Sequence, residues 1–349
     1  MKTINVDIIH EELLKNKPKL SYSNDLDYLS WKKQIKEKYL ELLGFDNISK
    51  NECDLNFEIE ETIETKEYTR YRFTFESEKY CIVPCYLLIP KGEKKKWPVC
   101  ICLQGHTTGF HISIGEKKYE IDDGYLETST FAIDAVKHGF AAFCIEQRGM
   151  GERTTPLKSR HTALTCGCYH TAMTALLLGR TLIGERVWDV RKGIDCLSKF
   201  EDYLNLDDIS ILGNSGGGTA SYYSACYDER IKNVVVNCAI STYKDSIAAV
   251  WHCSCNYIPH SAEFFDMGEL SSLVAPRKLL ILAGELDPIF PLYGAKEVFK
   301  TMEKIYKKED ASNSLRMVII TGKAHYFDKE LAFTNLLEMK DLWDIANCF

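Results

Sequence analysis

Residues 210–219 read SILGNSGGGT, and this stretch decides the fold class. An apolar run leads into Gly213, Ser215 and Gly217 in the pattern G-x-S-x-G, and a segment compatible with a helix follows over 219–227. A strand, a tight turn and a helix in this order predict a nucleophile elbow, which exposes the serine hydroxyl. Side chains at the two glycines would collide where strand and helix approach, and the serine backbone is expected to be strained. The simpler alternative is a glycine-rich turn beside a serine that caps a helix.

A base and an orienting acid follow the serine in the order that such an elbow requires. A serine hydroxyl is a weak nucleophile and needs both partners. Asp287 lies just past the apolar run 278–284, and His325 follows the apolar run 317–320. Alone, Asp287 could be a turn residue before a proline and His325 a buried core histidine. Together with Ser215, in this order and at strand ends, they predict a catalytic triad.

The loop after an early strand supplies the fourth part of the site. The strand-like run 97–103 leads into Gly105 and His106. We expect the backbone N–H groups of His106 and Gly216 to form the oxyanion hole. A metal-binding or base role for His106 is the alternative, although His325 already fills the base position.

The composition of the chain indicates which partners and which cellular location to expect. The chain has 349 residues, of which 45% are hydrophobic, and a formal net charge of −7. An acidic chain without a basic block argues against nucleic acid or an anionic membrane as partner. No run approaches the roughly 20 apolar residues of a membrane span, and residues 1–10 lack an apolar signal core. We therefore expect a cytoplasmic protein whose 14 cysteines are reduced thiols.

Two cysteine pairs lie close to histidines. Cys166 and Cys168 form one C-x-C pair, and Cys253 and Cys255 form the other. A shared zinc ion or a redox pair is one interpretation, but zinc sites usually space their cysteines two to four residues apart. We therefore expect packing or pocket-lining thiols, no metal and no cofactor.

The chain divides into a short extension and one large domain. We expect a helical extension over 1–54, with an amphipathic helix at 25–43. The catalytic domain, 55–349, is expected to open with antiparallel strands within 57–90. Helices are predicted at 128–137, 163–178, 184–200 and 329–346, and further strands at 141–145 and 233–238. Alternation of strand and helix predicts an α/β fold with a mainly parallel, doubly wound sheet.

Residues 55–349 resemble the α/β-hydrolase superfamily, within it the acetyl-xylan esterase, cephalosporin deacetylase and dienelactone-hydrolase-like groups. The resemblance is carried by 103–106 (LQGH), 146–151 (EQRGMG), 186–189 (RVWD), 213–217 (GNSGG), 284–287 (GELD) and the His325 loop. It implies ester hydrolysis through an acyl-enzyme. It also implies that Arg148 braces the loops around the nucleophile, and we group Arg148 with the substrate-binding residues; a surface salt bridge is the alternative. Asn214 and Gly216 depart from the sugar-deacetylase pattern, where glutamine is common after the nucleophile.

The aromatic stretch 243–267 is expected to form a cap insertion over the active site. Trp251, Tyr257 and Phe265 are then expected to bind substrate and to narrow the acyl pocket. The alternative is that these side chains only anchor the loop to the core.

The sequence thus predicts a serine esterase that cleaves small-molecule esters of short acyl groups, including acetyl esters of a carbohydrate or a small metabolite. The oligomeric state is open, a homo-oligomer included. A serine peptidase of the prolyl-oligopeptidase type, a non-catalytic binding protein of the same fold and a thiol-dependent metal-binding protein are the alternatives.

Overall fold

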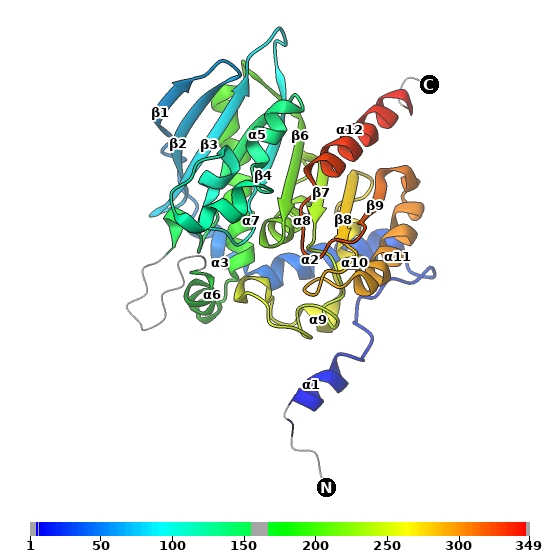
Figure 1. The fold of residues 1–349 in the computed structure, drawn as a ribbon. Helices are drawn as coiled ribbons and strands as arrows, with labels where there is room; N and C mark the ends of the chain where they lie inside the picture. The colour runs from blue at the N-terminus through cyan, green and yellow to red at the C-terminus, as the bar shows by residue number, and fades with distance from the viewer. Residues whose placement is uncertain (1–4, 6, 155–166, 347–349) are drawn as a thin grey trace.

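The computed structural model describes residues 5, 7–154 and 167–346. These residues form a nine-stranded sheet in the order β1-β2-β3-β5-β4-β6-β7-β8-β9 (Figure 1). The strands are β1 Glu58–Glu64, β2 Tyr68–Glu78, β3 Cys81–Pro90, β4 Trp97–Leu103, β5 Ala141–Ile145, β6 Leu204–Asn214, β7 Ile231–Asn237, β8 Lys278–Gly284 and β9 Leu315–Ile320.

The direction of the strands follows the expected fold class. The first three strands and the β3–β5 pair are antiparallel. From β5 through β4 to β9, each neighbouring pair is parallel. The α/β-hydrolase fold with N-terminal antiparallel strands is therefore confirmed.

Helices cover both faces of the sheet (Figure 1). The α-helices of the described residues are α1 Asp7–Leu13, which stands apart from the sheet, α2 Tyr28–Leu43, α3 Phe45–Ser49, α4 Asp123–Leu126, α5 Phe131–Lys137, α6 Cys168–Leu177, α7 Leu182–Cys196, α8 Gly216–Tyr227, α9 Ser261–Phe264, α10 Met267–Leu270, α11 Leu292–Lys308 and α12 Lys329–Ala346. Among the described residues, no helix is both long and apolar enough to cross a bilayer. Of the expected helix 163–178, the part before residue 167 lies outside the described residues.

Alternating side chains of the central strands build two apolar layers. Val99 and Ile101 of β4 belong to a large core with α2, α7, α8 and α11. Cys100 and Cys102 point to the opposite face and pack with α5 and α12. Successive side chains of a strand face opposite sides of a sheet, so each strand contributes to both layers.

Helix α2 joins the segment 1–54 to the main core. Its buried residues Trp31, Ile35, Tyr39 and Leu43 recur at three- and four-residue intervals. The helix ends at Gly44, whose φ of 78° lies in the left-handed region that glycine adopts readily. The buried face of α2 belongs to the same apolar cluster as the sheet, so this helix is packed against the main core.

Substitution within α2 tests whether this contact stabilises the whole fold. Ile35 is fully buried, whereas Leu29, on the same helix, is 76% exposed. We expect Ile35→Ala to lower the free energy of unfolding by about 2–5 kcal/mol and Leu29→Ala to change it by less than about 0.5 kcal/mol. Urea unfolding followed by circular dichroism should show one shifted transition. An unchanged main transition in Ile35→Ala would mean that the extension is thermodynamically separate.

Candidate active site

The turn between β6 and α8 carries Ser215. Its φ of 54° and ψ of −122° lie outside the regions that side-chain-bearing residues favour. A Cβ atom at Gly213 would collide with the carbonyl group of Gly217, and one at Gly217 would collide with the carbonyl oxygen of Leu103. Both glycines are therefore required by the close approach of strand and helix, as the sequence predicts.

Asn237, at the end of β7, connects this turn by hydrogen bonds to the loop that carries His325. The backbone N–H of Ser215 donates to the carbonyl oxygen of Asn237 at 3.0 Å. The side-chain Nδ2 of Asn237 donates to Asn214 Oδ1 at 2.6 Å and to the carbonyl oxygen of Tyr326 at 2.9 Å. Asn237 is fully buried, so these contacts are shielded from water. Sequence reasoning missed this positioning residue; its only signal was an asparagine at the end of the expected strand.

Asp287 and His325 form the expected acid–base pair. Asp287 Oδ2 lies 2.8 Å from Nδ1 of His325. The other oxygen, Oδ1, accepts the backbone N–H groups of Ile289 at 2.8 Å and Phe290 at 3.0 Å. Burial opposes ionisation of Asp287, but the hydrogen bond and charge of His325 and the two N–H groups outweigh it and hold its pKa below the usual value. The carboxylate is thereby fixed toward the imidazole, whose other nitrogen remains for proton transfer.

One cavity of about 530 Å³ brings the expected residues together. Ser215, His325 and His106 line it, and Asp287 stands behind the imidazole. Phe290 stacks on the His325 ring with an interplanar angle of 18°. A nucleophile, a base and a supported acid at one concave surface are the parts of a hydrolytic site.

The expected oxyanion loop passes directly beside Ser215. A Cβ atom at Gly105 would lie 3.1 Å from the carbonyl oxygen of Asn214 and 3.5 Å from Cβ of Ser215. The imidazole of His106 lies against Gly216, where a Cβ atom would overlap the ring. This contact gives a physical reason for glycine at position 216, where the resembling families often have glutamine.

A buried carboxyl group, that of Glu146, forms hydrogen bonds with residues on both sides of this loop. Glu146 is fully buried and accepts Gln104 Nε2 at 2.6 Å, Phe110 N at 3.2 Å and Glu152 N at 3.3 Å. Burial raises the pKa of Glu146 to about 7. Glu146 belongs to the EQRGMG motif, which is the only signal in the sequence for this supporting role.

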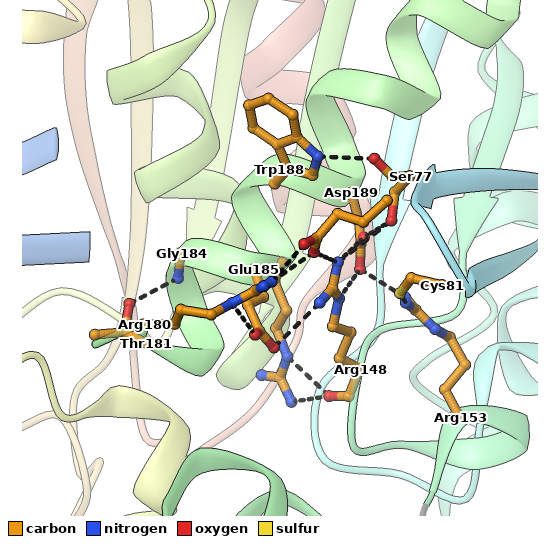
Figure 2. A network of polar contacts seen from close by, with 12 residues as sticks. Ser77, Cys81, Arg148, Arg153, Arg180, Thr181, Gly184, Glu185, Trp188 and Asp189 are labelled. Carbon is orange, nitrogen blue, oxygen red and sulfur yellow. Dashed lines mark hydrogen bonds and ion pairs between the residues drawn. The ribbon is translucent and has the colours of Figure 1, made fainter. Parts of the chain in front are cut away.

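Arg148 lies in a buried network of charges (Figure 2). Its guanidinium donates to Asp189 Oδ2 at 2.9 Å and to Glu78 Oε1 at 2.6 Å, and it pairs with Glu185 at 3.2 Å. Arg153 also binds Asp189, at 2.6 Å. Arg148 is 8% exposed and is not among the residues that line the cavity. Its placement favours a bracing role over both a substrate contact and a surface salt bridge.

The aromatic residues of the expected cap lie in three different environments. Trp251 lines the cavity and is 89% exposed. Tyr257 lines a separate pocket and Phe265 is buried in the main core. Only Trp251 is therefore in a position to meet a substrate in the Ser215 cavity, and Phe265 anchors the segment as the alternative interpretation proposed.

Three cysteines of the two C-x-C pairs lie beside the loop that carries His106. Cys168, Cys253 and Cys255 gather around the His106 side chain, next to the catalytic cavity. Cys166 lies outside the described residues.

Comparison with known proteins agrees with this fold. The "Putative hydrolase YtaP" of Bacillus subtilis (strain 168) is 26% identical over 238 residues, which cover 67% of this chain and 75% of that protein. The structure of a "putative acetyl xylan esterase" from Bacteroides fragilis superposes with a TM-score of 0.80 at 16% identity, covering 97% of this chain and 96% of that one. A glucuronoyl esterase from Solibacter usitatus superposes with a TM-score of 0.67 at 14% identity, covering 94% and 98%. These two structures share the fold.

The model of the Abhydrolase family matches residues 3–305, which include Ser215 and Asp287. With a match over most of its length, the chain belongs to the Abhydrolase family.

Proposed function

We propose that the protein is a serine-dependent carboxylic ester hydrolase that works through an acyl-enzyme. The observation that carries the proposal is Ser215 on a strained turn, in one cavity with a His325 that is bound to Asp287. Membership of a hydrolase family and the esterase names of structural neighbours support it.

The reaction follows from the roles of these groups. His325 accepts the proton of the Ser215 hydroxyl as the serine oxygen attacks the ester carbonyl. Asp287 holds the imidazole in the required tautomer and stabilises its positive charge. The backbone N–H groups of His106 and Gly216 bind the oxyanion, each contributing roughly 2.7–4 kcal/mol to the transition state. His325 then protonates the leaving alcohol and activates the water that releases the acid.

Within this proposal we favour a short acyl group and a carbohydrate or other polar alcohol as the two parts of the substrate. Trp251 stands exposed at its border, beside polar residues such as Asn256. Indole rings combine a large apolar surface with a polar N–H, which suits a substrate that is only partly buried. Acetyl esters are therefore our preferred substrate class.

Replacing the nucleophile is the first test. We expect Ser215→Ala to lower kcat by about 10⁶-fold, as removal of a triad nucleophile does, without changing the thermal midpoint appreciably. A fluorophosphonate probe should label the parent and the control Ser198→Ala, whose serine is on the surface. Labelling of Ser215→Ala to the same extent would show that another residue is the nucleophile.

Asp287 gives a prediction for both rate and pH dependence. Asp287→Asn should lower kcat by about 10⁴-fold, because the amide Nδ2 would donate to the imidazole and hold it in the wrong tautomer. Because the folded pKa of Asp287 lies below its usual value, its ionisation stabilises the fold above that value, and this contribution is lost as the pH falls through the folded pKa.

The stability difference between the parent and Asp287→Asn should therefore shrink as the pH falls below about 4. Urea unfolding over a pH series measures it. The exposed Asp25→Asn variant is the control and should follow the parent at every pH. A difference that grows toward acid pH would contradict the proposed pair.

The acyl pocket is tested with p-nitrophenyl acetate, butyrate and octanoate. We expect kcat/KM to be highest for acetate, because added methylenes must displace packed atoms at a cost of roughly 1–3 kcal/mol. Trp251→Ala should flatten this preference, whereas Tyr257→Ala, outside the cavity, should leave it unchanged. A preference for octanoate would refute the short-acyl proposal. Peptide substrates assayed in parallel would expose a peptidase, and inactivity toward every ester would favour a binding protein.

A further inference from the structure

Four potential metal ligands converge beside the oxyanion loop. His106 follows β4, Cys168 begins α6, and Cys253 and Cys255 belong to the segment before α9. One ligand atom from each lies within 4.8 Å of all the others. His106 Nε2 is 3.2 Å from Cys255 Sγ.

These distances suit a tetrahedral zinc ion. Zinc–sulfur bonds of about 2.3 Å and zinc–nitrogen bonds of about 2.0–2.1 Å place tetrahedral ligands about 3.5–3.8 Å apart. Small side-chain rotations would bring the four atoms from their present separations to these values. Three thiolates and one imidazole form a common ligand set of structural zinc sites.

A buried positive charge beside the cluster also favours zinc bound by three thiolates. Arg186, only 1% exposed, donates from Nη2 to Cys168 Sγ at 3.0 Å and to the carbonyl oxygen of Arg148 at 2.7 Å. Its Nη1 has no hydrogen-bond partner among the described residues. Zinc with three thiolates carries a net charge of −1, and a buried guanidinium beside it would balance that charge.

Four buried cysteines on the described strands pack in a different way. Cys85, Cys100, Cys102 and Cys144 lie on central strands, and their side chains pack into the two apolar layers. Those thiols behave as small apolar side chains. The cluster at His106 instead joins three thiols, an imidazole and a guanidinium at one place, which packing alone does not require.

We propose that His106, Cys168, Cys253 and Cys255 bind one zinc ion and that this ion fixes the oxyanion loop. With four protein ligands the site is closed, so zinc acts structurally. Binding converts three thiols to thiolates and releases their protons. Because the His106 ring also lies against Gly216, the ion would hold both oxyanion donors in place. This proposal departs from the sequence-based expectation of no metal, and only its link to the oxyanion hole rests on the proposed function.

Metal analysis of untagged protein tests the site without any assay of activity. We expect about one zinc per chain by inductively coupled plasma mass spectrometry, and far less in Cys168→Ser/Cys255→Ser. Cys53→Ser, a partly exposed thiol outside the cluster, is the matched control and should keep its zinc. Ser215→Ala should also keep it, so that failure of the esterase proposal and failure of the zinc proposal are distinguishable.

A second measurement, on the parent protein, tests the zinc site even if the double variant does not fold. Parent protein freed of zinc by a chelator and given Co²⁺ should develop thiolate-to-cobalt charge-transfer bands, together with the strong visible bands of tetrahedral cobalt. Removal of zinc alone should lower kcat more than it changes KM, because the oxyanion hole acts in the transition state.

Three outcomes would overturn the proposal. The first is parent protein that holds far less than one zinc per chain and takes up neither zinc nor cobalt after reduction. The second is a folded double variant that retains full zinc. The third is a disulfide among Cys168, Cys253 and Cys255 in non-reducing mass spectrometry, with no metal uptake after its reduction.

Discussion

The close approach of three backbone segments around Ser215 is the constraint on which the site depends. Strand β6, helix α8 and the end of β4 come so near that neither Gly213 nor Gly217 has room for a Cβ atom. The chain can turn there only if Ser215 adopts a positive φ, which is unfavourable for a residue with a side chain. The surrounding sheet must therefore supply the stability that keeps this turn in place, and in return the hydroxyl is held at the surface of the cavity.

Buried polar groups connect this turn to the rest of the site. Asn237 binds both the nucleophile turn and the His325 loop, so a shift of one moves the other. Glu146 binds Gln104, next to the loop that carries His106, and Arg148 binds Asp189 in a buried network of charges. Buried charges are expensive unless they are paired and hydrogen-bonded. A network of this kind fixes one arrangement of the loops because any other would leave charges without partners.

His106 links the Ser215 turn to the thiol cluster. Its backbone belongs to the oxyanion loop, its ring packs on Gly216, and its Nε2 approaches Cys255. Gly216 and His106 therefore depend on each other, because a larger residue at position 216 would displace the His106 ring. A metal ion at this point would add rigidity where small displacements of a hydrogen-bond donor reduce catalysis most.

The sequence by itself determined the fold class, the alternation of strands and helices and the residues expected as a triad. It could do so because these depend on local signals: apolar runs, the glycine pattern around Ser215, and polar residues placed at strand ends. The pairing of Asp287 with His325 follows from that order along the chain, since parallel strands end at one edge. The positions of Arg148, Tyr257 and Phe265 relative to the Ser215 cavity were decided by the tertiary structure, because burial depends on which surfaces meet. So was the gathering of Cys168, Cys253 and Cys255 around His106. Their spacing along the chain argued against zinc, but ligands from separate segments meet only after the loops have packed against the sheet.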